Sequence, residues 1–218
     1  MQFEFCQHYN AQLRPYYIPQ LMPDPLHLSL WFPDFSGPAM LPHTLAVLQQ
    51  FPFSKLRPGI SYLAVQPVSW NEASVLERRF SPGIDPEEAI AATADLIHDD
   101  YAYVFDASWD LWAPGKNIGE WNHAASLVRF IVQGEEFDDR TQEQTGHILI
   151  DFGLDSLFLQ EDIELTGEAQ NKVRDNVGKL VECTLKAEKN TRASGRLLWS
   201  ESEGNLAQKL IARLQKTQ

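Results

Sequence analysis

The chain has 218 residues, of which 44% are hydrophobic and 22% charged, with a formal net charge of −12 and an isoelectric point near 4.9. This composition is typical of a globular chain that can bury one sizeable core, so we expect residues 1–218 to form a single domain. Nucleic acids and anionic membranes are bound through Lys and Arg side chains that displace counterions, so the acidic balance argues against both as partners.

The N-terminal residues and the cysteines give no sign of targeting or of a redox role. The N-terminus has no positive segment followed by an apolar core, and no stretch approaches the roughly 20 apolar residues of a spanning helix. We therefore expect a cytoplasmic protein. The two cysteines, Cys6 and Cys183, lie far apart and lack metal-ligand spacing. They are expected to be reduced and to serve in packing.

The first third of the chain predicts an irregular segment followed by strand, helix and strand. Residues 1–25 begin with an expected strand at 3–6 and then become Pro-rich and irregular. Apolar and polar residues alternate over 26–32, which predicts a half-buried strand. Apolar residues at helical spacing over 41–51 predict a helix, and 60–68 is typical of a third strand.

The segment from Trp70 to Trp112 has the strongest local signals. Residues 73–80 predict a strand. Asp85 suits a helix N-cap and Pro86 suits the first helical position, so a helix is expected from there through Ile97. Residues 101–107 predict another strand, which should give way to a loop rich in aromatic and acidic residues.

Residues 26–107 thus give the order strand, helix, strand, strand, helix, strand, which is the βαββαβ order of a ferredoxin-like unit. Strands expected at 126–133 and 146–152 should extend the sheet. Apolar residues at helical spacing predict two helices within the C-terminal segment 168–218, which should cover one sheet face. The expected fold class is α+β with a mostly antiparallel sheet. Because this topology hosts many unrelated functions, it favours none of them.

Charge is unevenly distributed along the chain. Residues 131–168 carry eleven acidic residues and one basic residue, whereas 169–218 carry ten basic and five acidic residues. The run Glu135-Glu136-Phe137-Asp138-Asp139 has two interpretations. It is a solvated loop facing the basic helices, or it is a site for a cationic partner with Phe137 as an apolar contact.

Catalytic and cofactor motifs give little support for an enzyme. Asp151-Phe152-Gly153 matches the metal-binding tripeptide of protein kinases, but the Gly-rich loop, strand lysine and HRD loop are missing, so a strand end explains it. No Rossmann, Walker, G-x-S-x-G or H-E-x-x-H pattern occurs. The nearest approach to a metal cluster is His98-Asp99-Asp100 with Asp106 and Asp110. Adjacent side chains point in different directions, so we expect no metal and no cofactor.

Tryptophans and carboxylates gather between residues 106 and 121. Most such tryptophans pack in a core, but a ring face beside a carboxylate also attracts a cationic group. This second interpretation defines a candidate surface for a basic protein, and Phe137 of the acidic run is added to it. The candidate binding residues are Asp106, Trp109, Asp110, Trp112, Glu120, Trp121 and Phe137.

Two functions remain open. The first is a non-catalytic cytoplasmic binding protein that uses this acidic, Trp-bearing surface to bind a basic protein, as an immunity or inhibitor protein of a bacterial toxin system would. The second is a small-molecule-binding protein or hydrolase-type enzyme with a pocket between the sheet and the C-terminal helices, which would use His98, Asp106, Asp110 or His123. A deep pocket where these groups converge would favour the second function, and a shallow acidic patch with an exposed Trp the first.

Overall fold

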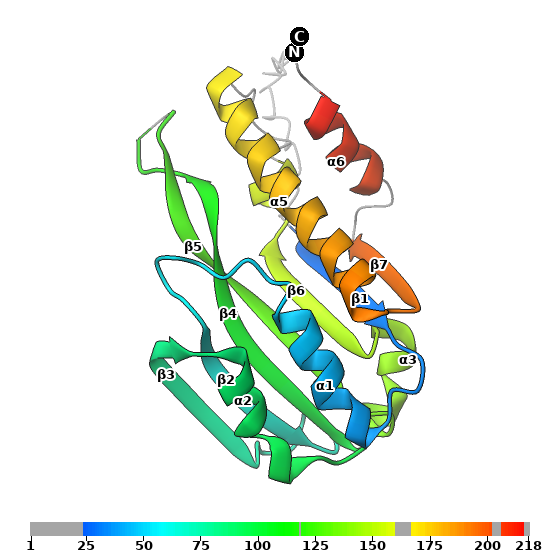
Figure 1. Ribbon diagram of the computed structural model, residues 1–218. Coiled ribbons are helices and arrows are strands. Elements are labelled where there is room, and N and C mark those ends of the chain that lie inside the picture. The colour runs from blue at the N-terminus through cyan, green and yellow to red at the C-terminus, as the bar shows by residue number, and fades with distance from the viewer. Residues whose placement is uncertain (1–23, 118, 160–166, 202–205, 216–218) are drawn as a thin grey trace, which may run out of the picture.

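A computed structural model describes residues 24–117, 119–159, 167–201 and 206–215 (Figure 1). The expected strand at 3–6, the Pro-rich segment up to residue 23 and Cys6 lie outside the described residues. Within the described ranges, helices accompany one seven-stranded antiparallel sheet, which confirms the α+β class. No helix in these ranges is long and apolar enough to cross a membrane.

The sheet has the strand order β3-β2-β4-β5-β6-β1-β7. Its strands are β1 (Pro25–Trp31), β2 (Ile60–Pro67), β3 (Leu76–Ile84), β4 (Tyr101–Pro114), β5 (Trp121–Gln133), β6 (Ile148–Leu154) and β7 (Gly195–Ser200). The α-helices are α1 (Gly37–Leu48), α2 (Pro86–Ala91), α3 (Gln142–Thr145), α4 (Ser156–Leu159), α5 (Gly167–Thr191) and α6 (Leu206–Gln215). Two 3-10 turns, η1 (Ala94–Leu96) and η2 (Phe137–Arg140), precede β4 and α3.

The ferredoxin-like arrangement expected for residues 26–107 is not confirmed. The elements follow one another in the expected order along the chain, but β1 pairs with β6 and β7 rather than within its own unit. β5 and β6 separate β1 from β4. The reason is that alternation of apolar residues decides which face of a strand is buried, whereas the neighbour of that strand is decided by long-range pairing.

Several elements differ in extent from those predicted. The helix after Asp85 ends at Ala91, and the chain continues through the buried Thr93 into η1. β4 continues to Pro114, so the aromatic and acidic residues after 107 belong to a strand and not to a loop. β7 was not predicted, since its sequence GRLLWS does not alternate.

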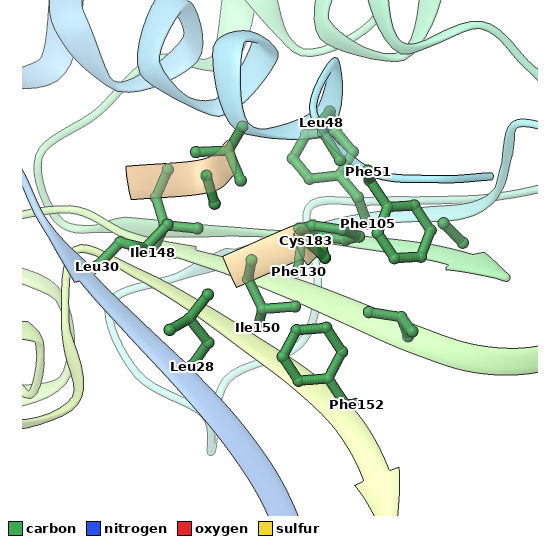
Figure 2. Close-up of a cluster of buried hydrophobic side chains, with 14 of the residues drawn as sticks. Leu28, Leu30, Leu48, Phe51, Phe105, Phe130, Ile148, Ile150, Phe152 and Cys183 are labelled. Carbon is green, nitrogen blue, oxygen red and sulfur yellow. The ribbon is translucent and has the colours of Figure 1, made fainter. Parts of the chain in front are cut away.

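The core lies between the sheet and the helices. Figure 2 shows strand side chains gathered against the end of α1 and the turn after it; the labelled residues are Leu28, Leu30, Leu48, Phe51, Phe105, Phe130, Ile148, Ile150, Phe152 and Cys183. The apolar stripe of α5 belongs to the same cluster, through Val173, Val177 and Leu180. The described part of the C-terminal segment therefore packs on the sheet, as a helix with one apolar face should.

One edge of β4 is covered by side chains and a loop instead of a strand. β2 pairs with β4 only as far as Ala107. Beyond that point, Ser54 N donates to Ser108 O at 2.7 Å, and Lys179 Nζ donates to Asp110 O at 2.7 Å. Both partners come from segments that pack over this edge, namely the loop after α1 and the middle of α5.

Asn176 of α5 completes this edge. It is 0% exposed, and its amide forms hydrogen bonds with both backbone groups of Trp112. Trp112 N donates to Asn176 Oδ1 at 2.9 Å, while Nδ2 donates to Trp112 O at 2.8 Å and to Leu157 O at 2.9 Å. A single buried side chain thus joins β4, α4 and α5.

We expect Asn176→Ala to lower the free energy of unfolding by about 2–4 kcal/mol, because three hydrogen bonds are lost and backbone groups are left buried and unpaired. Urea denaturation followed by circular dichroism measures this loss. Asn171→Ala, at an exposed position of the same helix, serves as the control and should change stability by less than about 0.5 kcal/mol. Equal effects of the two changes would contradict the role assigned to Asn176.

Candidate functional site

The candidate residues predicted from the sequence do not form one surface. Trp109 is 1% exposed and Phe137 is 0% exposed, so neither ring is available to a partner. The Trp109 ring packs in the core, with its centroid 5.7 Å from that of Phe51 and 5.2 Å from that of Phe152. Its strand position explains this burial, because odd-numbered residues of β4 point toward the helices.

Asp106 lies on the opposite face of the sheet, in an ion pair with Arg129 of β5. The pair is bidentate, with Arg129 Nε 2.7 Å from Oδ1 and the second nitrogen 2.9 Å from Oδ2. This hydrogen bonding with Asp106 raises the pKa of Arg129. Both carboxylate oxygens of Asp106 are therefore already bonded to a cation of the same chain.

This ion pair belongs to a row of directly opposed residues that crosses the whole sheet. From β3 to β7 the row consists of Arg79, Tyr62, Asp106, Arg129, Asp151, His27 and Trp199. At one end the Arg79 guanidinium lies 5.0 Å from the centroid of the Tyr62 ring. At the other end the rings of His27 and Trp199 are 4.6 Å apart. Of its members, the sequence analysis singled out only Asp106 and Asp151; the row itself was not predicted, since it depends on the pairing of all seven strands.

Asp110 has a structural position next to the loop after α1. Its carboxylate accepts hydrogen bonds from the Ser54 hydroxyl and, at 2.9 Å, from Lys55 N. Burial alone would raise the pKa of Asp110, but these bonds and the nearby Lys179 bring it below its ordinary value. Asp110 thus holds residues 54–55 against β4 as a carboxylate.

Trp112, Glu120 and Trp121 lie near the far end of the β4–β5 hairpin, which projects beyond the other strands (Figure 1). The ring of Trp112 is 3.7 Å from that of His123, and Lys172 Nζ lies 4.9 Å from its centroid. We expected a partner protein to supply the cation beside this ring. In the structure, Lys172 of α5 supplies it. The Glu120 carboxylate accepts from Asn122 and Asn117, and these hydrogen bonds lower its pKa.

A second acidic region lies at the other end of β4, where backbone hydrogen bonds connect separate loops. Val68 N donates to Asp100 O, Glu136 N to Asp99 O and Asp138 N to Val68 O, each at 2.8 Å. We call this region the acidic loop surface. It consists of Val68, Trp70, Glu72, Asp99, Asp100, Glu135, Glu136, Asp138 and Asp139.

Trp70 is the aromatic residue of the acidic loop surface that reaches solvent. It is 44% exposed, and its ring stands nearly perpendicular to the buried Phe137 ring, at a centroid distance of 5.0 Å. Phe137 therefore supports Trp70 from beneath instead of contacting a partner itself. Arg140 is the one Lys or Arg in these loops, and it lies 3.6 Å from the carboxylate of Glu143.

The backbone of the acidic loop surface is conformationally unusual. Val68, Asp138 and Asp139 have φ values of 58°, 46° and 55°, and Arg140 follows with 65°. Left-handed φ is uncommon for residues other than glycine, and a β-branched valine there is a marked outlier. Such strain persists only where the surrounding structure imposes it, here through the hydrogen bonds between the loops.

Sequence reasoning found the acidic run at 135–139 but did not place Trp70 beside it. Trp70 and Phe137 lie 67 residues apart, and they meet because β2 and β5 both flank β4. The available signal was weak: Trp70 lies between Ser69 and Asn71, a polar context that is typical of a turn.

The pocket predicted between the sheet and the C-terminal helices is present in part. A cavity of about 350 Å³ lies between β4 and α5, and of the four groups assigned to such a pocket only Asp110 lines it. His98, Asp106 and His123 lie elsewhere. Across the described ranges, no group of three or more His, Cys, Asp or Glu residues is placed to hold a metal ion.

Comparisons with protein-family models, with curated proteins and with solved structures found no match to this chain.

Cys183 lines the cavity, and burial raises the pKa of its thiol to about 12. Because the thiolate is the reactive form, we expect almost no alkylation of folded Cys6→Ser protein by iodoacetamide at about pH 8. Mass spectrometry over time measures the adduct. The same variant in urea is the control and should be alkylated readily, so equal rates in the two states would contradict the burial of this thiol.

Proposed function

We propose that this protein is a non-catalytic binding protein of the cytoplasm that binds a basic protein partner through the acidic loop surface. The observation that supports this most directly is the half-exposed Trp70 ring, which rests on Phe137 in a region where backbone hydrogen bonds join loops that carry exposed carboxylates. An inhibitor of the immunity type, which neutralises a basic toxin, is the form of this function that the charge suits best.

The carboxylates and Trp70 have different tasks in this proposal. Exposed carboxylates at Glu135, Glu136 and Asp139 attract a basic partner from a distance and raise its association rate, and salt weakens this effect. They contribute little to affinity individually, since exposed ion pairs are weak. A Trp that becomes buried on binding contributes most of the affinity of many interfaces.

The acidic loop surface also suits binding because its form is fixed before a partner arrives. The backbone bonds of Val68 hold the turn that carries Trp70 against residues 100 and 138. Binding therefore requires little ordering of the loops, which reduces the entropy lost on association. At the hairpin tip, by contrast, Trp112 already contacts Lys172, and a partner would have to displace that contact.

The proposal is tested with the immobilised full chain and a lysate of the source organism. A partner is a protein that the wild type retains at low salt and releases at about 0.5 M salt, because screening removes the attraction between exposed charges. For that partner, isothermal titration calorimetry should show an affinity at least about tenfold weaker for Trp70→Ala.

Trp199→Ala is the matched control, because it removes a partly exposed Trp on β7. It should leave the affinity unchanged. The double variant Glu135→Gln/Asp139→Asn should mainly slow association and flatten the salt dependence. Retention that is unaffected by salt and by Trp70→Ala would refute the proposal.

A further inference from the structure

The cavity between β4 and α5 lies well apart from the acidic loop surface. It is bounded by the loop after α1, by the uncovered edge of β4 and by the middle of α5, and it is open to solvent on one side. Tyr101 lies next to the acidic loop surface, and Asp110, at the cavity wall, is nine residues farther along β4. Nine residues of extended chain span about 30 Å. A ligand in this cavity would not compete directly with a protein bound at Trp70.

One side of the cavity is apolar and aromatic. Its wall includes Pro52, Phe53, Trp109 and Cys183. With its pKa raised to about 12, the Cys183 thiol is neutral and behaves as a small apolar group. The volume of about 350 Å³ is at the lower end of the roughly 300–1,000 Å³ of ligand pockets, which suits a molecule of one or two rings.

The other side of the cavity carries ammonium groups with remaining hydrogen-bonding capacity. Lys179 donates to Asp110 O at 2.7 Å, which occupies one of its three N–H groups. Lys55 is exposed at the rim and forms no ion pair within the described part of the chain. Asp110 also lies at the wall, and its carboxylate, which accepts from Ser54 and Lys55 N and lies near Lys179, offsets one of these two positive charges.

The remaining charges at the cavity cancel each other. Lys186 Nζ lies 2.7 Å from the Glu182 carboxylate, and both groups are on the same helix. The cavity therefore keeps an excess of one positive charge, in a chain whose formal net charge is −12. A small cationic site next to an aromatic wall is what a molecule with an apolar body and one anionic group requires.

We propose that this cavity binds a small organic anion, with a flat apolar body against Phe53, beside the buried Trp109, and a carboxylate that accepts hydrogen bonds from Lys179 and Lys55. This site is independent of the proposed protein-binding function, because it uses other residues. The chemistry of the ligand is set by the combination of an aromatic wall and this excess of positive charge: a neutral ring would leave the positive charge without a counter-ion.

The test compares two probes that differ only in charge, 2-naphthoate and the neutral 2-naphthamide, titrated into the ¹⁵N-labelled full chain. We expect 2-naphthoate to shift the Trp109 indole N–H and the amides of Phe53 and Lys55 in a saturable manner. Because a charge-assisted hydrogen bond is lost, 2-naphthamide should bind at least about tenfold more weakly.

Lys179→Gln should reduce the affinity for 2-naphthoate to that for 2-naphthamide, because it removes the ammonium group and keeps a polar side chain. Lys189→Gln, which removes the same charge from α5 outside the cavity, is the matched control and should change neither affinity. If Lys179→Gln does not fold, Lys55→Gln, at an exposed loop position, tests the second ammonium group. We expect this variant to bind 2-naphthoate several-fold more weakly than the wild type.

The proposal is overturned if 2-naphthoate gives no saturable shifts at these residues, if both probes bind equally, or if neither lysine change weakens 2-naphthoate. Shifts of equal size in the Lys189→Gln and Lys179→Gln variants would indicate attraction to α5 in general, which also overturns it.

Discussion

The pairing of the β4 edge beyond Ala107 determines how the helices and loops around it are placed. Buried N–H and C=O groups require partners, and β2 is too short to supply them there. The loop after α1 contributes Ser54, and α5 contributes Lys179 and Asn176. A paired strand would form regularly spaced hydrogen bonds along this edge. The loop and the helix instead bond to it from two separate segments, and the cavity lies between them.

The same strand also separates the two candidate sites. The first residues of β4 lie beside the acidic loop surface, and its later residues form a wall of the cavity. Between them, Tyr103, Phe105 and Ala107 are fully buried. The central strand thus holds the proposed protein-binding surface and the proposed anion site apart, so the two proposals do not require the same residues.

Local sequence patterns predicted most elements of the fold, whereas contacts between distant residues decided the sites. Alternation at 26–32 and the signals at Asp85 and Pro86 are local, and both elements began within one residue of the expected position, although the helix ended before Ile97 and Asp85 forms no side-chain cap hydrogen bond. The neighbours of β1 could not be predicted, since their pairing depends on residues more than 100 positions away. The same limit applies to Trp112, whose context suggested a free surface: its cation, Lys172, lies 60 residues away on a helix.

The row of opposed residues across the sheet restricts which strand pairings the chain can adopt. Apolar alternation alone permits β5 to slip by two residues against β4, because the same face stays buried. Such a slip would place Asp106 opposite Leu127 or Ile131 instead of Arg129. Its nearly buried carboxylate would then lack a counter-ion, at a cost of several kcal/mol. The ion pair between Asp106 and Arg129 thus favours the observed register over others that bury the same apolar face.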